Sequence, residues 1–295
     1  MSVREVLVQL GGVATRAELV RLTSRSEVDA ALAVSELLVL SRGRYALPEA
    51  DEAMRAAHRL SGTVSHFSAA LHWGWAVKQP PPLPEVTLPG NRKVTREQRA
   101  GVALHRADLD VDEVAGAVTT RDRTLIDCLR SPDAAAGLAV ADSALRDGYS
   151  ASRLVRLANE ARGPGCRQVR RLAAEASELP DNPFESSLRA IALEVAGLSV
   201  RPQVPIFTRT EFLGRPDLVD EDLMIVLEAD SFEWHGGRGD LKRDARRYNA
   251  FVVNGWCVLR FAWEDVMFEP DHVRGVLTAL VAERTQAAIR CTCAA

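Results

Sequence analysis

The chain has 295 residues, 47% of them hydrophobic and 26% charged, a balance that excludes a disordered or fibrous protein. No stretch approaches the ~20 uninterrupted apolar residues of a membrane span, and the N-terminus has no apolar signal sequence. Five scattered cysteines fit neither a disulfide framework nor a zinc quartet, so we expect a cytoplasmic protein. The net charge of −3 argues against a polycation made for nucleic acid. The length suits two or three domains of about 100–200 residues.

The charges are unevenly distributed along the chain. Six arginines lie between 153 and 171 against Glu160 alone, and eight acidic residues lie between 211 and 233 against Arg215 alone. A second basic run follows from 238 to 247. Carboxylates bordered by arginines are what metal-dependent phosphodiester chemistry needs, and they are also common on solvated surfaces. Only their position in the fold can therefore distinguish a catalytic cluster from a solvated surface.

Residues 1–50 predict three short helices and a β-hairpin. Gly11-Gly12 ends the first helix, and a capping box at Thr15–Glu18 opens the second. The helices are expected at 3–10, 15–22 and 26–38, and the strands at 39–40 and 45–47. This order is typical of a winged helix-turn-helix, whose third helix enters the major groove while cations at the hairpin tip, here Arg42 and Arg44, meet phosphate. A helical protein-binding module is the alternative, because the net charge of this segment is zero.

Residues 51–178 predict a mixed α+β region without catalytic spacing. Helices are expected at 53–61, 65–73, 119–127, 138–146 and 151–162, and strands at 86–89 and 102–105. Segments 65–70, 119–127 and 141–146 resemble the AbiEi type of antitoxin and transcription factor, which carries a winged helix ahead of such a segment. The resemblance covers roughly residues 1–150. It implies DNA binding or autoregulation, with a possible protein partner of the toxin–antitoxin type. Three histidines here, His66, His72 and His105, are expected to be structural.

Residues 179–295 predict an α/β domain. Asn182-Pro183 starts a helix that runs to Ala196, and two prolines make 200–207 an edge strand. The remaining elements are expected as strands at 215–219, 223–230 and 256–261, a helix ending at Gly255, and a last helix at 271–288. The whole chain is thus expected to be a multi-domain α/β protein.

Three carboxylates are expected to converge in this domain. Glu228 and Asp230 are two apart on a strand and share a face. The turn at 220–222 allows a hairpin that returns Asp217 to the same end. Clustered carboxylates beside an apolar wall are costly because they repel one another and must be desolvated. A divalent cation relieves both costs, and Mg²⁺, with Mn²⁺ as a substitute, suits such ligands.

The order of elements over about residues 180–280 resembles the PD-(D/E)XK nuclease fold. The residues that carry the resemblance follow one another along the chain: Glu185 on the first helix, then Pro216-Asp217, then Glu228-Ala229-Asp230. The resemblance is to the Vsr-like branch, akin to very-short-patch-repair endonucleases. Its closest residue matches are 228–230, His235, Asp244, Arg247 and the run 255–261. It implies that Asp217 and Glu228 are metal ligands and that Glu185 helps from the first helix.

Two departures from the family pattern affect the expected mechanism. Asp230 replaces the lysine of the general pattern, so Lys242, Arg246 or a protonated His235 would meet the charge of the transition state. Ser231 stands where a glycine often follows in this branch. His235 is also a candidate general base, because the unperturbed pKa of histidine is about 6.5. The arginines expected on backbone phosphates are Arg238, Arg243, Arg246 and Arg247.

We therefore expect a metal-dependent DNA endonuclease of DNA repair or phage and plasmid defence, guided by a winged helix at 1–50, an antitoxin-like region at 51–178 and a nuclease-like domain at 179–295. A non-catalytic DNA-binding regulator with a degenerate nuclease fold is the alternative. An RNA-acting toxin is a third, because phosphodiester chemistry does not separate DNA from RNA. Each residue also has a structural alternative: Asp230 paired with Arg238 or Lys242, His235 packed in a loop, or Glu185 complementing a helix dipole.

Overall fold

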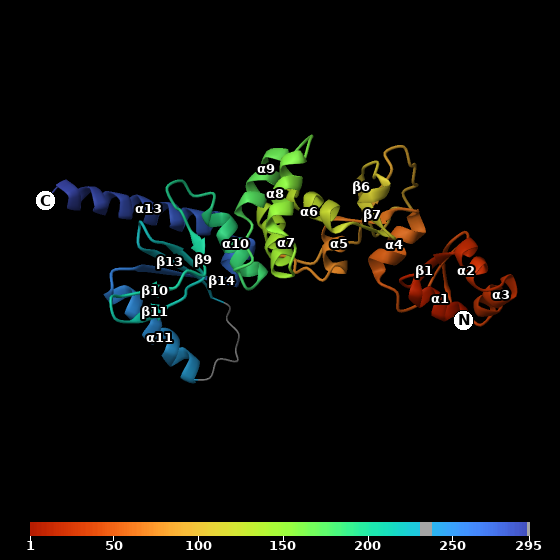
Figure 1. The fold of residues 1–295 in the computed structure, drawn as a ribbon, viewed down its shortest axis with the longest axis horizontal. Helices are drawn as coiled ribbons and strands as arrows, with labels where there is room; N and C mark the ends of the chain where they lie inside the picture. The colour runs from red at the N-terminus through yellow and green to blue at the C-terminus, as the bar shows by residue number, and fades with distance from the viewer. Residues whose placement is uncertain (231–237, 294–295) are drawn as a thin grey trace. The chain divides into compact units, whose positions relative to one another are not determined.

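The computed structural model describes the backbone of residues 1–230 and 238–293 and the side chains of residues 1–230 and 242–286. It is a mixed α/β protein (Figure 1), as expected. The chain divides into two compact units, unit 1 with residues 1–75 and 79–128, and unit 2 with residues 76–78 and 129–295. The predicted domain limits at 50 and 178 each fall inside a unit, so the three-domain division stays a prediction. No helix in the described part is long and apolar enough to span a bilayer.

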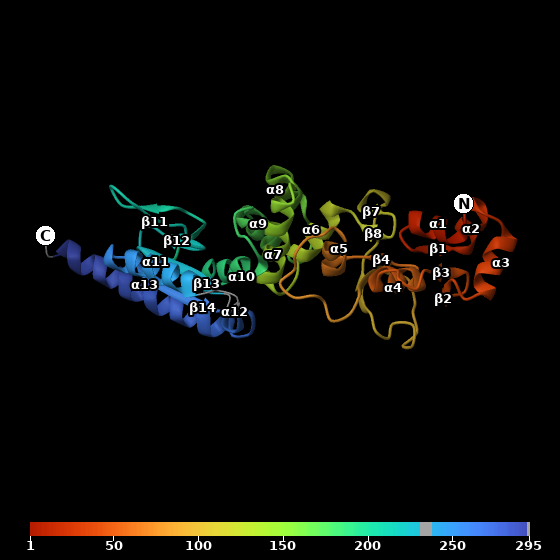
Figure 2. The ribbon, with the colours of Figure 1, turned by 90° about the horizontal axis from the view of Figure 1, so that it is seen from below.

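Unit 1 begins with three helices and a three-stranded antiparallel sheet of order β1-β3-β2 (Figure 2). The elements are α1 (Val3–Gln9), β1 (Val13–Thr15), α2 (Arg16–Leu22), α3 (Arg25–Ala33), β2 (Leu38–Ser41) and β3 (Arg44–Ala46). The predicted capping box of Thr15 and Glu18 is confirmed. The predicted end of the third helix at residue 38 is wrong. Ser35 takes a left-handed φ of 55°, and Val34 is 75% exposed instead of packing in the core.

The rest of unit 1 surrounds a five-stranded sheet of order β6-β5-β4-β8-β7. Its elements are α4 (Glu52–Leu60), β4 (Thr63–Val64), α5 (His66–His72), β5 (Glu85–Leu88), β6 (Ala103–Arg106), the 3₁₀ helix η1 (Val111–Glu113), β7 (Val114–Ala115), β8 (Val118–Thr119) and α6 (Arg121–Leu129). The predicted helices and the strands β5 and β6 are confirmed to within a few residues. Three further strands of two residues were not predicted, because two residues carry no alternation to read.

Unit 2 begins with a helical layer of α7 (Ala134–Arg146), α8 (Ala151–Glu160), α9 (Cys166–Glu175) and α10 (Pro183–Ala192). Helix α9 was not predicted. Asn182 caps α10 with Pro183 at its first position, as predicted, but the helix ends at Ala192 and not at Ala196. A buried ion pair joins α7 to α10, with Arg189 Nη2 2.7 Å from Asp142 Oδ1. Arg189 is 3% exposed and Asp142 is 0% exposed, so this pair fixes the helix that carries Glu185.

The second part of unit 2 is a four-stranded sheet of order β14-β13-β12-β9. It contains β9 (Arg201–Pro202), β12 (Leu218–Asp220), β13 (Ile225–Asp230) and β14 (Cys257–Ala262), and the two-stranded ribbon β10 (Ile206–Phe207) and β11 (Phe212–Gly214) lies beside it. The predicted hairpin of β12 and β13 is confirmed as an antiparallel pair, whereas β13 and β14 are parallel. The single edge strand predicted over residues 200–207 is instead two short strands: β9 lies at the edge of this sheet, as predicted, whereas β10 pairs with β11.

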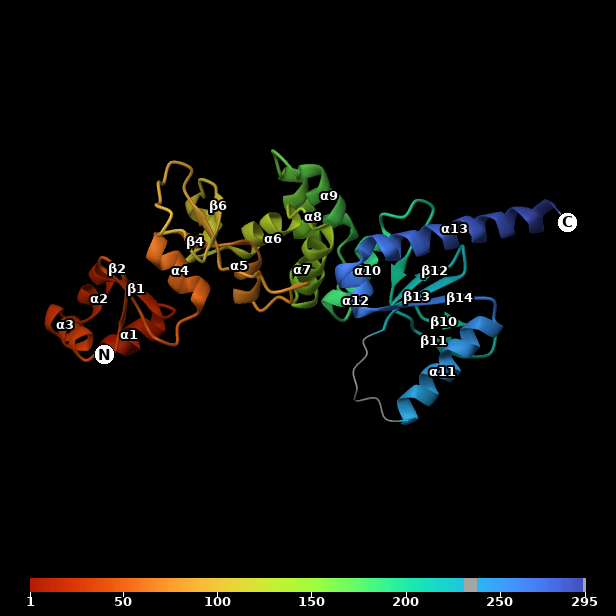
Figure 3. The same cartoon turned by 180° about the vertical axis from the view of Figure 1, so that it is seen from behind.

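Helices cover both faces of this sheet (Figure 3). Leu218 and Ile225 face a core with α10, α12 (Trp263–Phe268) and α13 (Pro270–Cys293). Their neighbours Val219 and Val226 face the opposite core with Phe251 of α11 (Arg238–Val253). The alternation of side chains along a strand thus produces a three-layer arrangement.

Removal of one partner of the buried pair is expected to destabilise unit 2 strongly. In Asp142→Asn, Arg189 keeps its charge in the interior, and the unfolding free energy should fall by about 3–5 kcal/mol in urea titrations. The control is Asp271→Asn, which removes the 94% exposed partner of Arg274 and should cost about 0–1 kcal/mol. Equal effects of the two variants would contradict the assigned role of the pair.

Candidate active site

Two of the three predicted carboxylates meet where β12 and β13 pair. Leu218 lies opposite Leu227 in the hairpin, so Asp217, one residue earlier, lies beside Glu228. The Ala229 backbone N–H donates to Asp217 Oδ2 at 2.8 Å. The two side chains also interact directly, because the Asp217 charge favours the protonated form of Glu228 and so raises its pKa. The predicted convergence of Asp217 and Glu228 is confirmed.

Glu185 is linked to this pair through a side chain that the sequence did not indicate. Its carboxylate accepts from Asp181 N–H at 2.9 Å and from Asn182 Nδ2 at 2.8 Å, both at the start of α10. Gln203 Nε2 donates to Glu185 Oε2 at 3.1 Å and contacts Asp217 Oδ1 at 3.4 Å. Gln203 follows β9 with a left-handed φ of 54°, and no spacing in the sequence marks it. The amide therefore bridges the two carboxylates.

Burial disfavours charge on all three carboxylates. It raises the pKa of Glu228 to about 8, with the Asp217 charge as the second cause. It raises the pKa of Glu185 to about 6, again with Asp217 as the second cause. The pKa of Asp217 is also raised by burial, against the lowering effect of the Ala229 N–H. The site therefore favours a proton or a cation over three free negative charges.

Arg247 of α11 approaches Glu228 without satisfying it. Its Nη2 lies 3.4 Å from Glu228 Oε1, which is buried yet has no hydrogen-bond partner. Arg247 Nε is likewise buried without a partner, while Nη2 donates to Tyr248 Oη at 3.2 Å. A Cβ on Gly214 would lie 2.9 Å from Phe251 Cζ and 3.1 Å from Arg247 Cδ. Only glycine therefore lets α11 pack this closely on β11.

Asp230 has a partner that was not predicted. It forms an ion pair with Arg260 of the parallel strand β14, and not with Lys242. The Arg260 guanidinium lies 4.4 Å from the centroid of the Tyr248 ring. The Arg247 guanidinium lies 5.1 Å from the same ring, so Tyr248 contacts both arginines. Arg260 lies opposite Glu228 in register, and its place in the predicted last strand was the available signal. Asp230 is thus held by a strand neighbour.

The remaining predicted residues that the structure describes have no place in this carboxylate cluster. Lys242 and Arg246 are exposed on α11, as is Arg243, and no contact joins any of them to Asp217 or Glu228 in the described part of the chain. His235 lies outside the described residues, as does the Arg238 side chain. In unit 1, Arg42 is exposed at the hairpin tip. Arg44 Nη1, by contrast, lies 3.3 Å from His58 Nδ1 of α4.

The residues present fit a cation at Asp217 and Glu228, but among the described residues neither Asp230, which pairs with Arg260, nor Glu185 completes a three-carboxylate group with them. No group of three or more histidine, cysteine, aspartate or glutamate side chains among the described residues is placed to hold a metal. The Glu185 carboxylate accepts hydrogen bonds from three nitrogen atoms, those of the Asp181 N–H, Asn182 Nδ2 and Gln203 Nε2. The buried, unpartnered Oε1 of Glu228 is the hard oxygen ligand that the pair offers.

The histidines of unit 1 have structural contacts. The rings of His66 and His105 stack with centroids 3.4 Å apart, and His105 Nε2 lies 3.2 Å from Glu85 Oε1. Burial and the adjacent His105 lower the pKa of His66 to about 3, so its ring is neutral. Glu85 also accepts from the Phe67 N–H at 2.8 Å. His66, His105 and Glu85 therefore interact with one another and with the backbone, which is a structural role.

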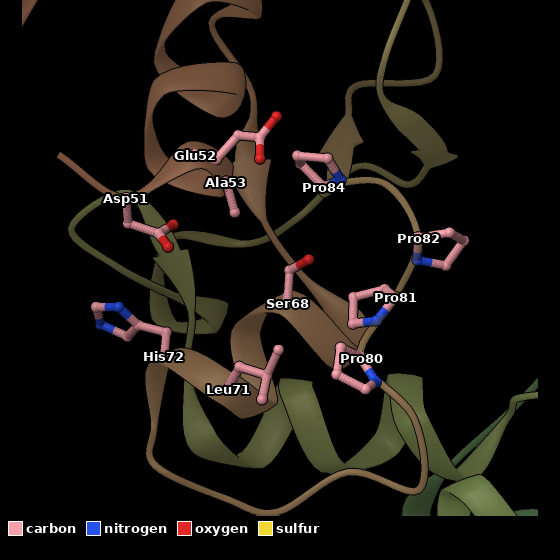
Figure 4. Close-up of a pocket in the computed structure, with 10 residues that line it drawn as sticks. All are labelled: Asp51, Glu52, Ala53, Ser68, Leu71, His72, Pro80, Pro81, Pro82 and Pro84. Atoms are coloured by element: carbon pink, nitrogen blue, oxygen red, sulfur yellow. The ribbon is translucent and has the colours of Figure 1, made fainter. Parts of the chain in front are cut away.

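A pocket of about 340 Å³ lies in unit 1, beside the proline-rich connector (Figure 4). Asp51 and Glu52 of the α4 start, His72 of α5 and the prolines at 80–82 line it. Asp51 Oδ1 accepts from the Met54 N–H and caps α4. The pocket does not include the carboxylate pair, which belongs to unit 2.

Comparisons with known proteins leave the function open. No family model matches the chain. It is 28% identical over 179 residues to the uncharacterized proteins Rv2248 and MT2308 of two Mycobacterium tuberculosis strains, a match over 60% of this chain. The chain spans 64% of the length of these relatives. A crystal structure of the RV2827C protein of Mycobacterium tuberculosis covers 63% of this chain and 78% of its own, with 16% identity. Its TM-score of 0.37 is too low to support a statement about the fold.

The raised pKa of Glu228 predicts a loss of stability at alkaline pH. Its folded pKa lies above its unfolded value, so its contribution is complete below the unfolded pKa and is lost as pH rises through about 8. Glu228→Gln should therefore be more stable than the wild type at pH 9, by about 1–3 kcal/mol since one pKa unit equals 1.36 kcal/mol. Urea titrations at pH 5 and pH 9 measure this, with the exposed Asp222→Asn as the control. A wild type that is more stable than Glu228→Gln at pH 9 would contradict the assigned direction of the pKa shift of Glu228.

Proposed function

We propose that the chain is a metal-dependent DNA endonuclease whose site is the Asp217–Glu228 pair. The observation that carries the proposal is the burial of two adjacent carboxylates, one with an oxygen that has no hydrogen-bond partner among the described residues. A protein keeps such a costly pair where a cation or a proton has a task. The order of α10, the mixed sheet and α11 supports the same proposal, because it agrees with the resemblance to nucleases of the Vsr-like branch.

The surrounding residues position this pair for hydrolysis. Mg²⁺ or Mn²⁺, when bound, supplies a water of lowered pKa and positive charge beside the phosphate. Glu228 has to release its proton first, because only the carboxylate is a metal ligand. The Ala229 N–H and Gln203 hold Asp217 in place. His235 and Lys242 remain the proposed general base and the proposed cation for the transition state.

Unit 1 supplies the proposed DNA-reading module. Three helices followed by a hairpin, with the sheet order β1-β3-β2, are typical of a winged helix. Arg42 at the exposed hairpin tip is the proposed phosphate contact. Arg44, whose guanidinium lies beside His58, is proposed for the same role through its remaining donors.

A non-catalytic DNA-binding regulator is a second candidate, favoured by one contact. Arg247 lies 3.4 Å from Glu228, and a guanidinium in this position neutralises the carboxylate in place of a cation. In that case the nuclease-like layers only support the DNA-binding module.

Cleavage of DNA tests the first proposal. The purified chain should cut plasmid DNA with Mg²⁺ or Mn²⁺ and not with EDTA. Asp217→Asn and Glu228→Gln should each lower the rate by at least about 10²-fold, because each removes a ligand of the ion that stabilises the transition-state charge. Asp222→Asn, in the exposed turn of the same hairpin, is the matched control and should cut at the wild-type rate. Full activity of either ligand variant would exclude this site, and matched RNA substrates identify the nucleic acid.

Metal binding separates the two candidates without activity. Mg²⁺ in excess should raise the Tm of the wild type, since a ligand that binds only the folded state stabilises it by about 2.7 kcal/mol at a hundredfold excess over its Kd. The rise should be absent in Asp217→Asn and present in Asp222→Asn, as followed by differential scanning calorimetry. A wild-type Tm that does not respond to Mg²⁺ or Mn²⁺ would favour the regulator.

A further inference from the structure

Four arginines stand on the solvent side of the α8–α9 helical hairpin. Arg153 and Arg156 are one turn apart on α8, and Arg167 and Arg171 are one turn apart on α9. All four are exposed. We name them the α8–α9 arginines. Helices α8 and α9 pack against each other, and both belong to unit 2, which also contains the Asp217–Glu228 pair.

The helical spacing directs these side chains away from the core. Leu154 and Ala158 form the buried side of α8, and Val169 and Leu172 form that of α9. At 3.6 residues per turn, Arg156 lies opposite the first pair. By the same spacing, the two arginines of α9, at 167 and 171, lie opposite Val169.

Structural roles account for only part of the arginine-rich segment. Arg162 donates to the carbonyls of Asn159 and Glu160 and so satisfies the end of α8. Arg170 donates to the carbonyl of Ala161 at 2.9 Å. In contrast, Arg156, Arg167 and Arg171 have no hydrogen bond or ion pair to any side chain that the structure describes.

Two of the exposed arginines, Arg167 and Arg171, are arranged unfavourably for an isolated protein. Like charges one turn apart on a helix repel and destabilise it. The acidic residues of the two helices are Glu160 and Glu175, each at the last position of its helix. A polyanion laid across the hairpin removes this repulsion. Guanidinium groups suit phosphate in particular, because they donate two parallel hydrogen bonds.

We infer that the α8–α9 arginines bind the phosphate backbone of duplex DNA. This rests on the proposed function for the choice of DNA as the polyanion. A membrane surface fits less well, because an interfacial helix inserts its apolar face into lipid, whereas the apolar faces of α8 and α9 are already buried in unit 2. The surface would hold the duplex on the same unit as the carboxylate pair, without reading sequence.

Salt-dependent binding tests the inference. A fluorescent duplex is titrated with the full-length chain in EDTA across a potassium chloride series, so that no cleavage is required. Arg167→Gln/Arg171→Gln should weaken binding by on the order of tenfold and reduce the slope of log K against log salt by roughly 2, since each phosphate contact contributes about 0.9. The control is Arg96→Gln/Arg99→Gln, which removes two exposed arginines from a loop of unit 1 and should leave both values unchanged.

The outcomes separate this inference from the proposed catalysis. An unchanged slope in Arg167→Gln/Arg171→Gln, or an equal loss in the control, overturns the inference while metal-dependent cleavage can still be observed. Arginine-dependent binding to vesicles of anionic lipid without binding to the duplex overturns it in favour of a membrane. Loss of affinity confined to Arg167→Gln/Arg171→Gln supports it, even where the wild type does not cleave DNA. Circular dichroism of each variant verifies that α8 and α9 remain folded.

Discussion

The burial of two adjacent carboxylates, Asp217 and Glu228, is the constraint on which the rest of unit 2 depends. Neighbouring negative charges with little solvent repel each other, and burial raises the pKa of both. Asp217 accepts from the Ala229 N–H and from Gln203, which also donates to Glu185 of α10, and Arg247 of α11 lies 3.4 Å from Glu228. The ion pair between α7 and α10 and the close packing at Gly214 fix those helices. The stability of the unit and the chemistry of the site are therefore linked.

Much of the fold could be predicted from local signals. The Thr15 capping box, the Asn182-Pro183 helix start and the β12–β13 hairpin are confirmed, because each depends on a few neighbouring residues. Helix α9 was not predicted. Its apolar positions, Val169, Leu172 and Ala173, have helical spacing and were the available signal.

The acidic residues of the site could be predicted from the sequence, but the side chains that contact them could not. Asp217 and Glu228 could be placed from strand alternation and a short turn. Gln203, Tyr248 and the pairing of Arg260 with Asp230 could not, because they depend on sheet register and helix packing between distant segments. Arg260 pairs with Asp230, the third carboxylate of the predicted cluster, and donors at the start of α10 and Gln203 engage Glu185. Partners of buried charges are a tertiary property.

The contact between Arg247 and Glu228 separates an active nuclease from a retained scaffold. A crystal of the full chain grown with Mn²⁺ and measured for anomalous scattering tests this directly. We predict a peak between Asp217 and Glu228, within bonding distance of an oxygen of each carboxylate, with Arg247 withdrawn from Glu228 Oε1. No peak at this position, with Arg247 hydrogen-bonded to Glu228, would contradict it.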